Sequence, residues 1–388
     1  MMEHTACTNW NEMPEAKFRA YLRDFIDANC LLDLRHVRRR QPPIVTMSWY
    51  KALYEAGLIA PGWPLEYGGM GLSPNRHLAY IEEMEDKGTP WLHDSGVRNL
   101  GPAIIAYGTE KQKVTYLPAI SAGEQIWCQG YSEPNAGSDL SSLRCAGVID
   151  GDTITINGQK IWTTSANHAS HIFLLVRSDN GPKKQYGISF VLIDIKTPGI
   201  TVRPISNLSG DDDFCEVFFD EVKVSTDLIL GKPHEGWKVA RSLLGFERIW
   251  AGSPHRAMKA LRELDVVLAT TGQTSDPFWQ DRRTQAEFDT LDAQDLYRTF
   301  AELVSVDGVV GTEVSALKIW SSEVFQRISE LSMEAAGADA ALLHSEHNYL
   351  TPVDTFFESR APTIFSGTNE IHRNILARRV LKLGEDRK

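Results

Sequence analysis

A loop and two strand-like runs between Trp127 and Thr164 constrain the fold of this chain more than any other stretch. The loop, Tyr131–Asp139, reads YSEPNAGSD, and its Pro, Asn and Gly residues are turn formers. Its small residues leave backbone N–H groups accessible beside two serine hydroxyls, and it contains no cation. Such a loop is suited to hold an anion or the polar edge of a heteroaromatic ring.

The two runs after the loop predict a β-hairpin. Asp150-Gly151 and Asn157-Gly158 flank Thr153–Ile156, where Ile alternates with Thr. The second strand then carries the indole of Trp162 and the hydroxyl of Thr164, two residues apart and therefore on one strand face. Loop and strand together predict a wall for a flat ring system, and an ordinary hairpin with a buried Trp remains the alternative.

Composition limits the class of protein. The chain has 388 residues, of which 42% are hydrophobic, enough for two or three domains with a sizeable core. A net charge of −11, with no basic run longer than Arg38–Arg40, argues against nucleic acid as a partner. Five scattered cysteines without CxxC or metal-ligand spacing fit a reducing cytosol. No apolar leader and no run of about 18 apolar residues is present, so we expect a cytoplasmic protein without a membrane span.

The first part of the chain, residues 1–121, is predicted to be helical. After Pro14, apolar residues from Phe18 to Ile26 recur at helical spacing. A Pro- and Gly-rich loop over 60–71 precedes a second helix over 74–86. Residues 122–234 are predicted to form a β domain, a small barrel or sandwich, from strands near 172–176, 187–193, 200–204 and 216–219. The acidic run 211–213 is interpreted as a solvated loop, because no further carboxylates stand at ligand spacing.

Residues 235–388 are predicted to be helical again. A long helix over 236–251 carries an apolar stripe, and Glu247 falls on its apolar side. A carboxylate in that position is costly unless it is paired or functional. The run Gly252-Ser253-Pro254 bends or interrupts this helix. Further helices are expected near 286–310, 313–336 and 369–383.

Three motifs in this order resemble the acyl-CoA dehydrogenases. They are SEPNAGSDL, INGQKIWTTSA and FSGTNEIHRNILARRVLKLG, and the similarity covers essentially the whole chain. The resemblance implies an α+β fold with an N-terminal helical domain (1–121), a central β-barrel domain (122–234) and a C-terminal four-helix bundle (235–388). It also implies FAD as the cofactor, and no metal.

The implied cofactor contacts are Gln129, Tyr131, Ser132, Ser138, Trp162, Thr164, Thr368 and Glu370. In the family the first three positions line the isoalloxazine, and the position of Ser138 meets the pyrophosphate. The positions of Trp162 and Thr164 lie at the flavin ring near N5, and the last two make the terminal contacts. His93 and Asp94 lie in the stretch 91–96, which borders the acyl pocket in the family. They would meet a polar acyl group, or else form a helix cap or a solvated turn.

The family removes hydrogens from Cα and Cβ of a thioester: a base takes the α-proton, and flavin N5 takes a hydride from Cβ. In much of the family the base is a Glu before Gly-Thr, but here Ser366 stands before Gly367-Thr368. Serine cannot serve as this base, although the backbone N–H of Ser366 can still donate to the thioester carbonyl. Other branches place a Glu-Arg pair on the long helix, which corresponds to Glu247-Arg248. Burial would raise the pKa of Glu247, as proton abstraction near neutral pH requires. A salt bridge from Glu247 to Arg248 or another cation is the alternative.

Two departures from the family pattern concern assembly. The family's Arg-x-x-Phe-Gly run, which contacts a neighbour's FAD, is absent from Ala269–Phe278, and Met333 stands where a Gln is usual. The pattern resembles bacterial branches in which two related chains form a heterotetramer, often on steroid or dicarboxylic acyl-CoA substrates. We therefore expect a homo- or hetero-tetramer, with an electron-transferring flavoprotein as the electron acceptor. A flavin oxidase or monooxygenase, and a non-catalytic or half-site partner subunit, are the alternative functions.

Overall fold

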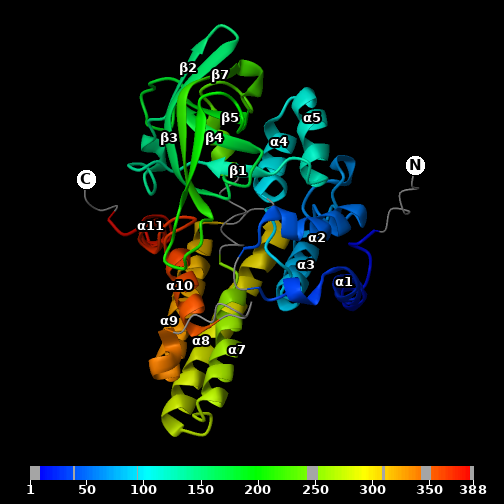
Figure 1. The fold of residues 1–388 in the computed structure, drawn as a ribbon, viewed down its shortest axis with the longest axis vertical. Coiled ribbons are helices and arrows are strands. Elements are labelled where there is room, and N and C mark those ends of the chain that lie inside the picture. The colour runs from blue at the N-terminus through cyan, green and yellow to red at the C-terminus, as the bar shows by residue number, and fades with distance from the viewer. Residues whose placement is uncertain are drawn as a thin grey trace. The chain divides into compact units, whose positions relative to one another are not determined.

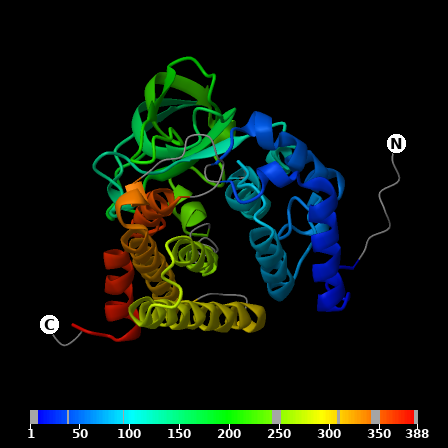
Figure 2. The same ribbon diagram turned by 60° about the horizontal axis from the view of Figure 1, so that its bottom comes forward.

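The computed structural model describes residues 9–37, 40–93, 95–242, 252–307, 311–341 and 351–384, with the backbone alone for 304–307. These residues form two compact units, which are described separately (Figures 1 and 2). The helical unit consists of the described residues within 1–38, 72–89 and 245–388. The sheet unit consists of those within 39–71 and 90–244.

The helical unit contains two N-terminal helices and the helices of the C-terminal part. Their bounds are α1 Glu15–Asn29, α3 Pro74–Asp86, α7 His255–Thr270, α8 Pro277–Asp307, α9 Ser315–Ala336, α10 Pro352–Arg360 and α11 Asn369–Ile375, the last continued by a π-helical turn over Leu376–Val380. In α1 the predicted stripe buries Phe18, Leu22 and Ile26 at i, i+4 spacing. The predicted helices over 14–26 and 74–86 are therefore confirmed.

Helices α7, α8 and α9 share one apolar core, and α10 packs against α9 and α7 in the same C-terminal bundle (Figure 1). Pro254 immediately precedes α7, which begins at His255. Helix α8 begins at Pro277, earlier than the expected 286, because proline is well tolerated in the first helical turn. The long helix expected over 236–251 is described only over 236–242, where it is helical.

The sheet unit combines short helices with one curled sheet. Its helices are α2 Pro43–Glu55, α4 Gly101–Tyr107 and α5 Glu110–Ser121, with a π-helical turn over Gly96–Leu100 before α4. Its strands are β1 Trp127–Gly130, β2 Ala146–Asp150, β3 Thr153–Thr164, β4 His171–Arg177, β5 Ile188–Asp194, β6 Ile200–Ile205 and β7 Phe214–Ser225. All four strands expected after the hairpin are present.

The strands follow the order β1-β4-β2-β3-β7-β6, with β5 paired to β4. Strand β4 runs parallel to β1 and antiparallel to β5, and every residue from Ile172 to Val176 is buried. This continuous burial indicates that the sheet curls around its core, as expected for the predicted β-barrel domain.

The hairpin prediction was right at one end and wrong at the other. β2 and β3 pair antiparallel around Gly151-Asp152, where Gly151 has φ +54°. Asn157-Gly158, however, makes no turn, because β3 continues through it. The pairing with β7 shifts register there, and the Asn157 side chain exchanges two hydrogen bonds, of 2.7 and 2.8 Å, with Glu221 on β7. The turn-forming dipeptide is used here at a β-bulge.

Candidate active site

A second bulge in β3 presents Trp162. Lys160 pairs with Val217 and Thr163 pairs with Cys215, so β3 carries one extra residue between them. Trp162 has φ +59°, which is rare for a bulky residue and marks a strained position. Its indole is 56% exposed and meets Phe214 edge-on at 6.0 Å. The alternative of an ordinary hairpin with a buried Trp is therefore wrong.

The bulge also fixes which residues flank the indole. Thr163 is fully buried, whereas Thr164 is half-buried. Trp162 and Thr164 thus lie on the side of β3 that faces away from the core, as the two-residue spacing predicts. An exposed indole beside a hydroxyl suits contact with a flat ring.

A buried ion pair ties the loop 131–139 to β3. The ammonium of Lys160 is completely buried and donates to the Glu133 carboxylate at 2.7 Å and to the Tyr131 carbonyl at 3.2 Å. The same carboxylate accepts from the backbone amides of Arg144 at 2.7 Å and Cys145 at 2.9 Å. A buried charge pair is tolerated only when its lone pairs are satisfied in this way. No local pattern in the sequence indicates this pair.

The remaining loop residues offer donors that a ligand can use. Ser132 is half-buried, and its carbonyl accepts from the Ile161 amide at 2.9 Å. Within the described residues, no hydrogen bond engages the hydroxyls of Ser132 and Ser138 or the amides of Gly137 and Ser138. A Cβ on Gly137 would meet no atom within 4 Å, so the loop faces open space there. These donors and the exposed indole fit a flavin with an anionic tail.

Two other predicted contacts are held within the sheet unit. Gln129 on β1 accepts at Oε1 from the Asn99 side chain at 3.1 Å. The buried Tyr131 ring packs edge-on against Phe173 and Phe190 at 6.0 and 6.2 Å. Both side chains are therefore held by contacts within the sheet unit.

The structure describes His93 but not Asp94. His93 is buried, and its Nε2 lies 2.9 Å from the Gln41 carbonyl oxygen. Its ring meets that of His168 edge-on at 5.6 Å, so a solvated turn does not describe His93. Asp94 lies outside the described residues, as do Glu247 and Arg248.

The helical unit holds the turn 366–368. Ser366 has φ +54° and Gly367 has φ +90°, two left-handed residues in succession. The Thr368 hydroxyl accepts from the Ile371 amide at 3.2 Å and caps α11. Glu370 lies in the first turn of α11, where hydrogen bonds from its own backbone amide and from Thr368 lower the pKa of its carboxyl.

Two buried side chains that the sequence analysis missed contact this turn. Lys318 on α9 is fully buried and donates to the Gly367 carbonyl at 2.6 Å and to Asn369 Oδ1 at 2.8 Å. Burial lowers the pKa of Lys318 to about 8. His372, 1% exposed, places Nε2 3.0 Å from the Ser366 carbonyl oxygen. The available sequence signal was that Lys318 shares a helix face with the buried Val314, Ser322 and Phe325.

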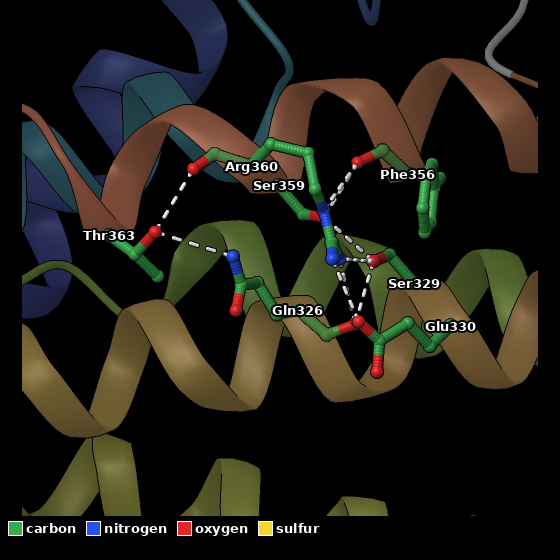
Figure 3. A network of polar contacts seen from close by, with 7 residues as sticks. All are labelled: Gln326, Ser329, Glu330, Phe356, Ser359, Arg360 and Thr363. Carbon is green, nitrogen blue, oxygen red and sulfur yellow. Dashed lines mark hydrogen bonds and ion pairs between the residues drawn. The ribbon is translucent and has the colours of Figure 1, made fainter.

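A network of contacts around Arg360 anchors the segment that leads into the turn 366–368 (Figure 3). Arg360, at the end of α10, donates to Glu330 at 2.8 Å and to Ser329 at 3.2 Å on α9. Its guanidinium carbon lies 4.3 Å from the centre of the Phe356 ring. The Thr363 hydroxyl in turn donates to the Arg360 carbonyl at 3.0 Å. The chain is thus fixed to α9 on both sides of residues 364–366.

The described residues contain no cluster of three or more His, Cys, Asp or Glu side chains arranged to hold a metal ion. Across the same ranges, no helix has both the length and the apolar character needed to cross a bilayer.

Comparison with known proteins identifies the family. Sequence models of three acyl-CoA dehydrogenase domains match in order: the N-terminal domain at 14–124, the middle domain at 128–222 and the C-terminal domain at 234–381. The chain is 34% identical over 388 residues to acyl-CoA dehydrogenase IpdE1 of Mycolicibacterium smegmatis, covering 95% of this chain and 97% of that one.

Solved structures agree with this assignment. The steroid ACAD Tcur3481-Tcur3483 superposes with a TM-score of 0.87 at 26% identity, over 96% of this chain and 98% of that one. The ChsE4-ChsE5 complex from Mycobacterium tuberculosis gives a TM-score of 0.82 at 28% identity, over 98% and 99%. The fold expected from the sequence, helical N- and C-terminal parts with a central curled sheet, is confirmed. This chain therefore belongs to the acyl-CoA dehydrogenase family of oxidoreductases.

Proposed function

We propose that this chain catalyses the FAD-dependent α,β-dehydrogenation of an acyl-CoA thioester to the 2-enoyl-CoA. The observation that carries the proposal is the exposed indole of Trp162, held by a bulge beside a loop whose donors at Ser132, Gly137 and Ser138 are open. FAD, when bound, supplies the acceptor for the hydride from Cβ. Trp162 and Thr164 would face the ring near N5, while Gln129, Tyr131 and Ser132 would line the isoalloxazine and Ser138 the pyrophosphate.

Glu247 is proposed as the base that takes the α-proton. Ser366 occupies the position from which much of the family supplies its base, and serine has no useful basicity at neutral pH. Glu247-Arg248 is the pair that the other branches use, and its place on the apolar side of a predicted helix suits a carboxylate of raised pKa. As negative charge develops on the thioester oxygen, the backbone at Ser366 and Gly367 would stabilise it. Arg248 and Asp94 would contact the substrate.

The substrate class we propose is an acyl-CoA with a steroid-derived acyl group. A structural relative that covers 96% of this chain is a steroid ACAD. We also propose a tetramer with a related chain, because the steroid ACAD Tcur3481-Tcur3483 and the ChsE4-ChsE5 complex each carry a name that joins two proteins. Thr368 and Glu370 would contribute the terminal FAD contacts, and an electron-transferring flavoprotein would receive the electrons.

The test is an anaerobic titration of the purified protein with acyl-CoAs, followed by its visible spectrum. We expect a flavin absorption band that bleaches with a CoA thioester on a steroid nucleus, and less with straight-chain thioesters of equal carbon number. Flavin that none of these thioesters reduces would contradict the proposed reaction.

A half-site subunit is the second candidate, and a specific observation favours it. The turn between α7 and α8 has no Arg, and Met333 on α9 stands where the family uses a Gln to contact a neighbour's FAD. A chain that is colourless when expressed alone, and gains flavin only when co-expressed with a related chain, would favour this reading.

A further inference from the structure

Two buried side chains donate hydrogen bonds to carbonyl oxygens of the turn 366–368. His372 Nε2 lies 3.0 Å from the Ser366 carbonyl oxygen, and Lys318 Nζ lies 2.6 Å from the Gly367 carbonyl oxygen. Both side chains are essentially inaccessible, at 1% and 0% exposure. Each donor therefore contacts the turn from within the helical unit, not from solvent.

These two contacts also fix the direction in which the backbone N–H groups of the turn point. In a planar trans peptide the C=O of one residue and the N–H of the next point in opposite directions. The carbonyls of Ser366 and Gly367 are fixed toward His372 and Lys318, so the N–H groups of Gly367 and Thr368 point away from these buried side chains. In the described part of the chain, no hydrogen bond engages either of these N–H groups.

Because its backbone is left-handed, the turn 366–368 depends on the hydrogen bonds from its two anchors, His372 and Lys318. Ser366 has φ +54°, which costs a non-glycine residue conformational energy unless surrounding contacts hold it. At Gly367, with φ +90°, a Cβ would lie 3.0 Å from His372 Nε2. The turn is thus strained, closely packed against one anchor and hydrogen-bonded to both.

Burying Lys318 is costly, which indicates that its contact with the Gly367 carbonyl is functional. Among the described residues, no carboxylate lies within ion-pair distance of its ammonium, whose partners are the Gly367 carbonyl and the Asn369 amide oxygen. Glu323 on α9 and Glu370 on α11 act on it only from a distance, and Arg373 opposes them. A buried ammonium with neutral partners is destabilising compared with an apolar residue of the same size. Residues that break a local rule at such a cost are concentrated at functional sites.

We propose that Lys318 and His372 are positioning residues, which hold the Ser366–Thr368 turn so that its backbone donors meet the developing charge on the thioester oxygen. This inference rests on the proposed dehydrogenation. The ammonium behind the Gly367 carbonyl polarises that peptide, which strengthens its N–H as a donor. A contact that strengthens as the oxygen becomes negative lowers the barrier more than it tightens substrate binding.

The test measures kcat and KM separately for the acyl-CoA that best reduces the wild-type flavin. Lys318→Met and His372→Leu remove one donor each and keep apolar bulk. We expect each to lower kcat by roughly tenfold to a hundredfold, with KM and flavin content within about threefold of wild type. His372→Gln restores a donor at a similar reach and should recover kcat to within about fivefold. Ser315→Ala is the matched control, because its buried hydroxyl on α9 has no partner among the described residues.

The outcomes separate the two proposals. A wild-type flavin that no acyl-CoA reduces would overturn the dehydrogenation itself, and the inference with it. If the wild type is active, then folded and flavin-loaded variants with kcat within twofold of wild type would overturn the positioning role alone. Failure of His372→Gln to recover kcat would also overturn it. If Lys318→Met fails to fold, Lys318→Gln replaces it, because glutamine keeps an uncharged donor. Hydrogen–deuterium exchange of peptides covering 361–375 must then be faster in Lys318→Gln than in Ser315→Ala.

Discussion

The buried pair between Lys160 and Glu133 gives the most quantitative prediction. Substituting Lys160 by Met removes the ammonium and leaves the Glu133 carboxylate, whose residue is only 9% exposed, without its cation. Breaking a buried pair from one side costs about 3–5 kcal/mol. Because the carboxylate keeps its two backbone donors, at Arg144 and Cys145, we expect the lower end, about 3 kcal/mol.

The chain provides a matched control for this substitution. Lys184 and Asp139 also lie 2.7 Å apart, but their side chains are 64% and 54% exposed. An exposed pair of the same length contributes about 0–1 kcal/mol, so Lys184→Met should change the free energy of unfolding by no more than that. The N···O distance is the same in both pairs, so the larger loss expected for Lys160→Met reports burial and the additional bond to the Tyr131 carbonyl.

The assay is urea denaturation of both variants and wild type, followed by tryptophan fluorescence. The double variant Lys160→Met/Glu133→Gln removes both charges and should recover part of the loss, with a coupling of about 1–3 kcal/mol. Loss of flavin affinity should accompany Lys160→Met, since the same ammonium holds the Tyr131 carbonyl. A loss below about 1 kcal/mol, equal to that of Lys184→Met, would contradict a high cost of leaving the buried Glu133 carboxylate unpaired.

Three further predictions follow from single sites. Gly101→Ala would place a Cβ 2.0 Å from Trp63 Cζ2 in the sheet unit, so we expect overpacking of about 1–3 kcal/mol in urea denaturation, and a loss within error would contradict the close contact. Trp162→Ala should weaken FAD binding by about tenfold in a fluorescence titration, whereas Trp162→Phe should weaken it less, because a ring is retained. Lys318 has a pKa of about 8 in the folded chain and 10.5 in its ordinary state, so the unfolded chain binds more protons between these values. Stability should therefore rise from pH 8 to 10 by up to about 1.4 kcal/mol per pH unit relative to Lys318→Met, and equal slopes would contradict the burial of the charge.

The sequence predicted those parts of the fold that depend on local patterning. The apolar spacing in α1 and the β-branched runs of β4, β5 and β6 specify their elements within a few residues, because period and element type are coupled. The run at 216–219 indicated β7 but not its length, since β7 extends to Ser225. The turn at Gly151 was predictable for the same reason, since its dipeptide favours a left-handed backbone.

The remainder depends on partners that are distant in the sequence. Asn157-Gly158 has the composition of a turn, yet pairing with Glu221, 64 residues away, makes it part of a continuous strand. Lys160 lies 27 residues from Glu133, and Lys318 lies 49 residues from Gly367, so neither buried contact can be inferred from spacing. The left-handed Trp162 likewise results from its register against β7, which no local pattern specifies.

Among the site residues, the six predicted contacts in the sheet unit lie along β1, the loop 131–139 and β3, on one continuous stretch of chain. Ser366, Gly367, Thr368 and Glu370 lie together at the start of α11 in the helical unit. The roles of all these residues, and those of Glu247, Arg248 and Asp94, stay predictions.

Anaerobic single-turnover reduction of the flavin by a steroid acyl-CoA, in wild type and in Glu247→Gln, tests both the proposed dehydrogenation and its base. Wild type should bleach, whereas Glu247→Gln should keep its flavin and its affinity for the thioester but fail to bleach, because an amide cannot take the α-proton. Bleaching of Glu247→Gln at a rate within tenfold of wild type would contradict Glu247 as the base. A wild-type protein whose bound flavin no acyl-CoA reduces would contradict the proposed dehydrogenation.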